Sequence, residues 1–301
     1  MDYRGYAEFL PAEFRDRITV GPESTWWNWR DMNVHVARAR RPESPVRVLA
    51  LHGGGGHSAL VWPLASLVAD EGVDVAAIDL PLYGRTEVPR RSAVRYHDWI
   101  DLLCDFATAE DDGRPLVVFG ASMGGMLGYE LAARSGSVSM VIATCLLDPS
   151  DPAARAAASR FSWMGRSAPV TLRAMSTVAG GLSVPISWMA DTAAMSRNPA
   201  LSRACMDDPL GAGVRVPIGW LSSYMNYSHA APESFTDTPV LLVHPAADSW
   251  TPPELSLRFL DRVAAPTRDV MLENCGHFPA EQPGLDQLET ALREAVDLEL
   301  R

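Results

Sequence analysis

The sequence lacks the features that mark exported, membrane-spanning or nucleic-acid-binding proteins. Its first twenty residues have no basic start followed by an apolar run, so they do not resemble a signal peptide. No uncharged apolar stretch reaches the ~18 residues that a membrane-spanning helix needs. We therefore expect a cytoplasmic protein without stable membrane insertion.

Basic clusters, paired cysteines and nucleotide-binding loops are also missing. The net charge is −11 and the longest basic cluster is 38–41, so a nucleic-acid partner is not expected. The four cysteines are scattered, without a C-x-x-C pair, which argues against a zinc site or a disulfide framework. No glycine-rich loop has the spacing of a phosphate-binding motif. We expect no cofactor and no metal, and the sequence does not indicate an oligomeric state.

The composition is that of a folded protein with a sizeable core. Of 301 residues, 47% are hydrophobic and 21% are charged, close to the averages for globular proteins. This length fits one large α/β domain or two smaller ones, so it leaves the number of domains open.

Short apolar runs alternate with segments of helical periodicity, which predicts an α/β fold whose mostly parallel sheet has helices on both faces. A hairpin is expected first, over 25–38, with its tryptophans packed against the main sheet. The expected strands are 46–52, 73–79, 116–120, 140–147, 239–244 and 267–272. The expected helices lie around 60–68, 96–109, 123–134, 253–263 and 285–298.

The alternation is interrupted between 149 and 230. This segment has no convincing parallel strand, is rich in Ala, Ser, Met and Trp, and is punctuated by prolines. Its Ala-rich stretch at 153–158 indicates a helix. We therefore expect a helical cap over 149–230, inserted between two parts of one core, 1–148 and 231–301.

A G-x-S-x-G motif, Gly120–Gly124, stands between an expected strand and an expected helix. That setting is typical of a nucleophile elbow, a tight turn that holds its serine in a strained backbone conformation. The serine is Ser122. Amides at the start of the following helix have no intrahelical acceptor and can stabilise a developing oxyanion. Met123 N–H is therefore the first oxyanion donor that we predict.

A second glycine-rich segment follows the first buried strand. The strand 46–52 runs into four successive glycines, Gly53–Gly56, where a second oxyanion donor is expected. Four glycines are entropically costly for a simple turn, which favours a functional interpretation. We predict Gly54 N–H as the donor, with His52, Gly53 and Gly55 supporting the loop.

An acid and a base follow in later loops. Asp248 comes directly after the strand 239–244, and His277 lies in the loop before the last helix. Both loops leave the carboxyl edge of the sheet, where open α/β sheets bind their ligands. Asp148, directly after the strand 140–147, is an alternative position for the acid.

Five motifs together resemble the α/β-hydrolase superfamily of serine hydrolases, over both expected core parts. They are LHGGGG, DLPLYGRT, GASMGG, AADSWTP and CGHFP. The resemblance implies that Ser122 is the nucleophile, His277 its base and Asp248 the acid that orients the base. It gives Asp79, in DLPLYGRT, a structural role.

The remaining histidines have no clear motif. His35, His97 and His229 are expected at the surface or in packing, while His57 and His244 stay open between a structural role and contact with substrate.

The substrate is inferred from the cap, whose methionine and tryptophan side chains make adaptable apolar surfaces. Nine such residues are Trp163, Met164, Met175, Trp188, Met189, Met195, Met206, Trp220 and Met225. They favour a carboxylic ester with an apolar acyl or aromatic group, and the chain is similar to monoacylglycerol lipases and lysophospholipases. Two alternatives remain open: a carbon–carbon bond hydrolase resembling the meta-cleavage-product hydrolases, and a ligand receptor without catalysis.

Overall fold

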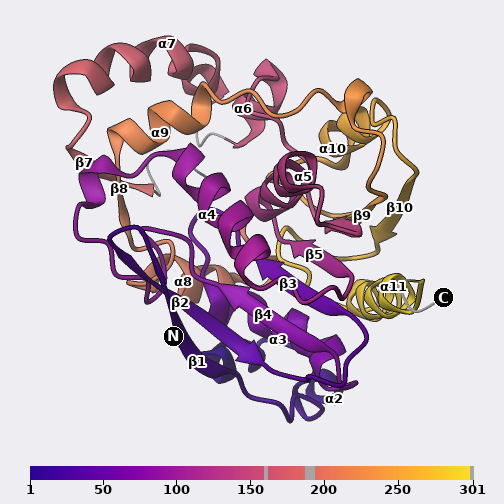
Figure 1. Cartoon of the computed structure of the whole chain (residues 1–301). Coiled ribbons are helices and arrows are strands. Elements are labelled where there is room, and N and C mark those ends of the chain that lie inside the picture. The colour runs from indigo at the N-terminus through magenta and orange to yellow at the C-terminus, as the bar shows by residue number, and fades with distance from the viewer. Residues whose placement is uncertain (159–161, 187–193, 299–301) are drawn as a thin grey trace.

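A large β-sheet forms the centre of the computed structural model, which describes residues 1–158, 162–186 and 194–298 (Figure 1). Its strands are β1 (Glu23–Trp29), β2 (Met32–Ala39), β3 (Arg47–Leu51), β4 (Asp74–Ile78), β5 (Leu116–Gly120), β6 (Met140–Ala143), β9 (Val240–Pro245) and β10 (Thr267–Leu272). They lie in the order β1-β2-β4-β3-β5-β6-β9-β10. The pairs from β4 through β10 are parallel, and the hairpin β1–β2 is antiparallel and extends one edge. The predicted mostly parallel sheet is confirmed.

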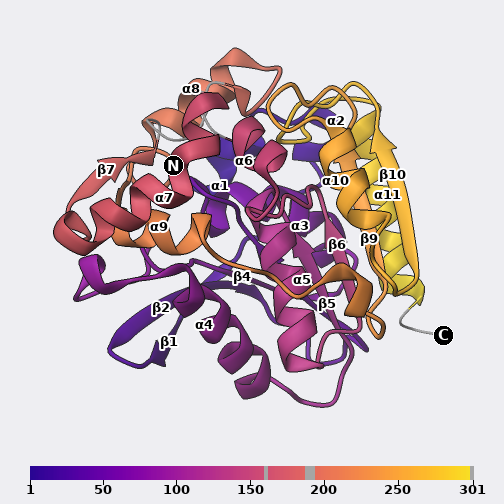
Figure 2. The same cartoon turned by 90° about the horizontal axis from the view of Figure 1, so that it is seen from above.

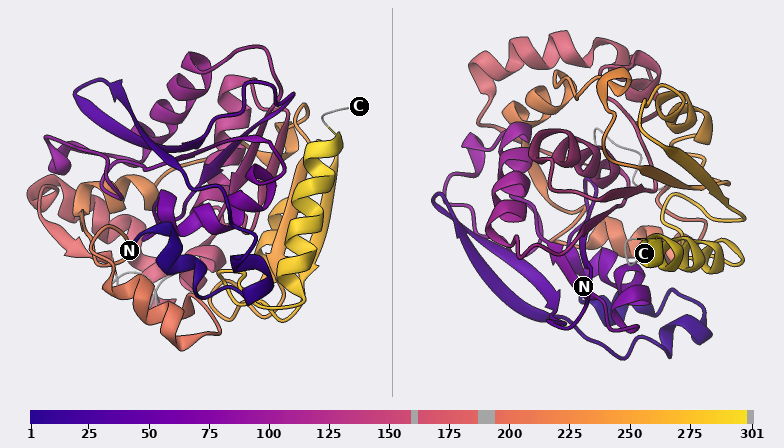
Figure 3. Two further views of the ribbon diagram at one scale, coloured as in Figure 1. Left: turned by 90° about the horizontal axis from the view of Figure 1, so that it is seen from below. Right: turned by 45° about the vertical axis from the view of Figure 1, so that its right-hand side comes forward.

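Helices cover both faces of the sheet, as the alternating sequence pattern predicts. The helices of the main fold are α1 (Tyr3–Ala7), α2 (Ala12–Arg15), α3 (Ser58–Ala69), α4 (Tyr96–Ala109), α5 (Met123–Ser135), α10 (Pro253–Leu260) and α11 (Gly284–Leu298). The core on one face contains side chains of α4, α5 and α10, and the core on the other contains those of α1, α2, α3 and α11. The view from below in Figure 3 shows α11 and the N-terminal helices on the same side of the molecule.

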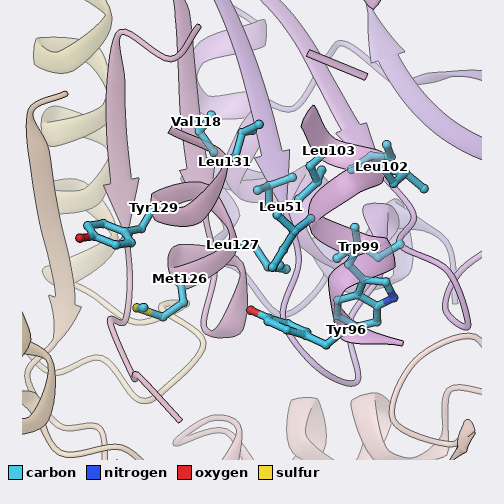
Figure 4. Packing of buried hydrophobic residues seen from close by; sticks show 14 of the residues in the cluster. Leu51, Tyr96, Trp99, Leu102, Leu103, Val118, Met126, Leu127, Tyr129 and Leu131 are labelled. Carbon is cyan, nitrogen blue, oxygen red and sulfur yellow. The ribbon is translucent and has the colours of Figure 1, made fainter. Parts of the chain in front are cut away.

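The central strands divide their side chains between these two cores. On β3, Leu49 and Leu51 enter the core beneath α4 and α5, while Val48 and Ala50 enter the opposite one. This period of two follows from the pleat of a strand buried on both faces. Figure 4 shows Leu51 among side chains of α4 and α5, including Trp99 and Leu127. The packed sheet is the platform on which the loops at its carboxyl edge are positioned.

The segment between β6 and β9 is mainly helical, as predicted. It contains α6 (Pro152–Ala158), α7 (Ser162–Ala179), β7 (Ser183–Pro185), α8 (Pro199–Asp207), β8 (Arg215–Pro217) and α9 (Ile218–Met225). Helices α7 and α9 lie at the top of the view in Figure 1, away from the sheet. The short antiparallel pair β7–β8 was not expected. The division of the chain at 148/149 and 230/231 stays a prediction.

Two local expectations are corrected, and two short helices are added. The strand predicted over 140–147 ends at Ala143, because the Thr144 side chain accepts a hydrogen bond from Ser122 N–H and the chain leaves the sheet there. Trp27 and Trp29 pack against the core as expected, but Trp26 points outward from the same strand and is 48% exposed. The helices α1 and α2, which precede the hairpin, were not predicted.

No helix in the described ranges is long and apolar enough to cross a membrane.

Candidate active site

Ser122 occupies the sharp turn between β5 and α5. Its backbone has φ 54° and ψ −124°, in the positive-φ region that a side chain makes unfavourable. The turn depends on Gly120, where a Cβ atom would lie 2.2 Å from the carbonyl oxygen of Gly124. The predicted strand–turn–helix geometry is therefore present.

The three predicted residues Ser122, His277 and Asp248 lie in one hydrogen-bonded line. The distance from Ser122 Oγ to His277 Nε2 is 2.8 Å, and that from His277 Nδ1 to Asp248 Oδ2 is 2.7 Å. His277 and Asp248 are both buried, and the Trp250 ring lies 4.6 Å from the imidazole, centroid to centroid. With Nδ1–H donated to the carboxylate, Nε2 is free to accept the serine proton.

Asp248 is held as an anion by donors on both of its oxygens. Its Oδ1 accepts the backbone N–H groups of Trp250 and Thr251, while Oδ2 accepts the Thr251 hydroxyl at 2.7 Å as well as the imidazole. Burial acts to raise the pKa of Asp248, but the hydrogen bonds from His277 and Thr251 outweigh it and hold that pKa below its usual range. Sequence reasoning missed Thr251, although an aspartate followed by a short polar turn commonly binds the amides just after it.

The glycine-rich loop after β3 lies beside the elbow. A Cβ atom on Gly53 would be 2.8 Å from Cβ of Ser122, so the two segments are in close contact. In the described part of the chain, neither Gly54 N–H nor Met123 N–H donates to a protein acceptor. Both predicted donors are therefore available to a ligand beside Ser122.

His52 stabilises this loop through two hydrogen bonds. Its Nδ1–H donates to the Gly53 carbonyl at 2.8 Å, and its Nε2 accepts the Leu80 N–H at 3.0 Å. Burial lowers the pKa of His52 to about 4, so the imidazole is neutral near pH 7 and can make both bonds. Gly55, predicted with His52 as loop support, has φ +82° and faces Ala212 of the inserted segment.

The pocket that contains Ser122 is largely apolar. Gly54, Met123 and Thr251 line it together with Ser122, and no charged side chain of the described residues does so. Its walls are formed by Leu147, Ile186, Trp220, Leu221, Tyr224, Met225 and Trp250. Leu147 follows β6 and four of the others belong to α9, so α9 contributes most of the wall.

Two of the nine apolar residues predicted from the inserted segment, Trp220 and Met225, line this pocket. Met175 is instead 48% exposed, Met195 is buried in the core that contains α11, and Met206 is not part of the lining. The side chains of Trp163 and Met164, and the residues Trp188 and Met189, lie outside the described part of the chain.

The alternative acid and two further histidines lie elsewhere. Asp148 accepts hydrogen bonds from Ser150 and lies 3.5 Å from His229, which is buried against Tyr96. His97 is exposed.

The histidines whose role was left open have protein partners. His57 Nε2 lies 3.2 Å from the Asp208 carboxylate, and His244 Nδ1–H donates to the Pro245 carbonyl at 3.1 Å. Neither is among the residues that line the pocket.

Asp79 joins three segments of the main fold. Its carboxylate accepts the His35 imidazole at 2.8 Å and the backbone N–H groups of Ser58 and Arg85. Burial acts to raise the pKa of Asp79, and these hydrogen bonds together with the nearby imidazoles overcome it, holding the pKa at about 2. Its contacts are those of a residue that fixes backbone turns.

Within the described ranges, no group of three or more His, Cys, Asp or Glu side chains could hold a metal ion.

Several solved structures share this fold. A soluble variant of monoglyceride lipase from Saccharomyces cerevisiae, in complex with a substrate analog, is 15% identical over 93% of this chain and 97% of that chain, with a TM-score of 0.71. Monoacylglycerol lipase from Paleococcus ferrophilus is 23% identical over 88% and 99%, with a TM-score of 0.68. Est1E from Butyrivibrio proteoclasticus with bound ferulic acid is 15% identical over 92% and 99%, with a TM-score of 0.61. Identities this low show the common fold alone.

The family comparison is more decisive than these structures. No curated protein matches the chain. The model of the alpha/beta hydrolase family, however, matches residues 48–286, which is well over half of the sequence and includes the elbow and both loops described above. The chain therefore belongs to the alpha/beta hydrolase family.

Proposed function

We propose that the chain is a serine esterase that hydrolyses carboxylic esters with an apolar acyl or aromatic group. The observation that carries this proposal is the hydrogen-bonded line from Ser122 through His277 to Asp248, with Ser122 in the lining of an apolar pocket. A serine hydroxyl is a weak nucleophile until a neighbouring base takes its proton, and this arrangement supplies the base and its orienting acid.

In the first half of the reaction, Ser122 Oγ attacks the carbonyl carbon of the ester while its proton passes to His277 Nε2. The negative charge on the carbonyl oxygen is stabilised by Met123 N–H and Gly54 N–H, and each such donor is worth about 3 kcal/mol in the transition state. Asp248 stabilises the imidazolium. His277 then gives its proton to the leaving alkoxide oxygen, which departs as an alcohol and leaves an acyl group on Ser122.

In the second half, water attacks the acyl carbon and His277 takes its proton. The same two amides stabilise the second oxyanion, and the imidazolium returns a proton to Ser122 Oγ as the carboxylic acid leaves. The mechanism needs no cofactor and no metal, since nucleophile, base and oxyanion donors all come from this chain.

The pocket supports the apolar substrate class. Its walls come from aliphatic, methionine and aromatic side chains, and the described lining has no charged group to bind a charged acyl chain. Burial of a methylene group contributes about 0.8 kcal/mol, so each added carbon that fits should improve kcat/KM about three- to fourfold.

Hydrolysis of p-nitrophenyl esters from acetate to dodecanoate tests the proposal. We expect kcat/KM to rise with chain length until the pocket is filled, and Ser122→Ala to lose turnover while still binding a long-chain ester. The control is Ser135→Ala, at the far end of α5 from the elbow, which should keep wild-type rates. Absence of activity at every chain length, or hydrolysis of a dienoate carbon–carbon substrate with no ester hydrolysis, would overturn the proposal.

A further inference from the structure

Exposed apolar side chains gather on one helix of the inserted segment. Val178 is 90% exposed, Val170 77% and Met175 48%, and Leu182, just after the helix, is 65% exposed. Only two other large hydrophobic residues of the described chain, Met1 and Trp26, are exposed in this way. Large apolar side chains that cluster at a surface mark a site of interaction.

The exposed side chains of α7 form a continuous stripe. Val170, Ala174 and Val178 follow one another at intervals of four residues, so they lie on the same side of the helix, and Met175 borders them. Leu172 is buried on the opposite side, where the helix packs onto its neighbours. The helix is thus apolar on its solvent side as well as on its packed side.

The stretch of sequence that contains the stripe carries only basic charges. Between Asp151 and Asp191 the sequence has four arginines and no acidic residue, although the whole chain has a net charge of −11. Arg173 is exposed next to the stripe. The helices against which α7 mainly packs, α6 and α9, carry no Asp or Glu. The exposed apolar stripe of this acidic chain therefore has an arginine beside it and no acidic residue on the helices that pack against α7.

Helix α7 packs against α9, the helix that forms most of the wall of the pocket around Ser122. Helices α7 and α9 lie side by side in both Figure 1 and Figure 2. The Asn226 side chain, just after α9, donates to the Pro169 carbonyl of α7. Helix α9 is also the main wall of the pocket around Ser122. A surface that contacts α7 would therefore lie next to the helix that encloses the pocket.

We infer that α7 and the following turn dock on an anionic lipid surface. Exposed apolar side chains flanked by arginine are the pattern of helices that lie in the plane of a membrane interface, with the apolar stripe among the acyl chains and the basic residues at the anionic headgroups. We take the occupant to be a lipid surface rather than an acidic protein groove, because exposed apolar side chains run along the solvent side of the helix from Val170 to Leu182 in the following turn, and the exposed Arg173 lies beside them. Docking is peripheral and does not depend on the proposed ester chemistry.

Flotation with lipid vesicles tests this inference on the full chain. We expect the protein to float with vesicles of equal parts phosphatidylcholine and phosphatidylglycerol and to bind vesicles of phosphatidylcholine alone much more weakly. Raising the salt concentration should release it, because the electrostatic part of the attraction is screened. Arg173→Ala should weaken binding about fivefold.

The double variant Val170→Asp, Val178→Asp should abolish flotation. Both side chains are exposed, so hydrolysis of a soluble p-nitrophenyl ester and the melting temperature should stay at wild-type values. Trp26→Asp, an exposed apolar site on β1 and far from α7 in Figure 1, is the matched control and should still float. Equal binding to both kinds of vesicle at all salt concentrations, or undiminished flotation of the double variant, would overturn the inference. So would a wild-type dimer that becomes monomeric in the double variant and never binds vesicles, since the stripe would then contact a second copy.

Discussion

The Thr251 hydroxyl donates to Asp248 Oδ2 over 2.7 Å, the same oxygen that accepts the His277 imidazole. Its oxygen also lies 3.1 Å from His277 Nδ1. Thr251 thus contacts both His277 and Asp248, the pair that we propose activates Ser122, and it lines the pocket as well. A hydroxyl bonded to a buried carboxylate fixes the direction in which that carboxylate faces the imidazole.

Thr251→Val should lower kcat with little change in KM. Valine has nearly the same shape but no hydroxyl, so Asp248 loses a donor worth about 1.5–3 kcal/mol and turns more freely. We expect kcat to fall about tenfold or more, and Thr251→Ser to restore it. Steady-state kinetics on one p-nitrophenyl ester gives both constants. If serine and valine at this position behaved alike, the hydroxyl would have no positioning role.

Asp248→Asn should lower kcat by about 10⁴-fold without unfolding the protein, because an amide cannot stabilise the imidazolium and favours the wrong tautomer of His277. Asp148→Asn is the matched control: its carboxylate is bonded to Ser150 and lies near His229, so the rate should change little. The reverse ranking of the two variants would make Asp148 the acid.

Asp79 should contribute acid-sensitive stability. Its pKa is held at about 2 in the folded protein, below the ordinary value of 3.8, so its contribution is complete above pH 5 and is lost as the pH falls toward 2. Asp79→Asn lowers the free energy of unfolding at both pH values, and we expect this decrease to be about 1 kcal/mol smaller at pH 3 than at pH 6. Urea denaturation at the two pH values measures this difference. Asp269→Asn, exposed on β10, should show no such trend, and a pH-independent loss in Asp79→Asn would refute the explanation.

Much of the sheet could be predicted because its central strands, such as β5 and β9, are buried on both faces. The run 116–120 is predicted with the bounds that β5 has, since apolar residues fill it and turn residues flank both ends. The end of β6 could not be predicted, because the apolar run continues to Leu147 while the chain turns away to place Thr144 and Leu147 beside Ser122. Periodicity does not distinguish a buried strand from a buried pocket wall.

The site was predictable where short motifs constrain the backbone. Ser122, Asp248 and His277 lie in loops that follow strands of the parallel sheet. The predicted order of strands therefore places all three at the carboxyl edge of that sheet. The pocket walls were harder to predict, because they come from α9 and from Ile186 and Leu147, and no motif marks which apolar side chains of the inserted segment face Ser122. Met175 and Trp220 both belong to the apolar residues from which the substrate pocket was predicted. Met175 is exposed, whereas Trp220 is fully buried and lines the pocket.

The central claim is that the Ser122 hydroxyl is activated by His277. Mass spectrometry after reaction with a fluorophosphonate tests it most directly, because the probe labels activated serines. We predict one adduct, on the peptide that contains Ser122, absent in Ser122→Ala and strongly reduced in His277→Ala. An unlabelled wild-type protein, or an adduct on another serine that persists in Ser122→Ala, would contradict the claim.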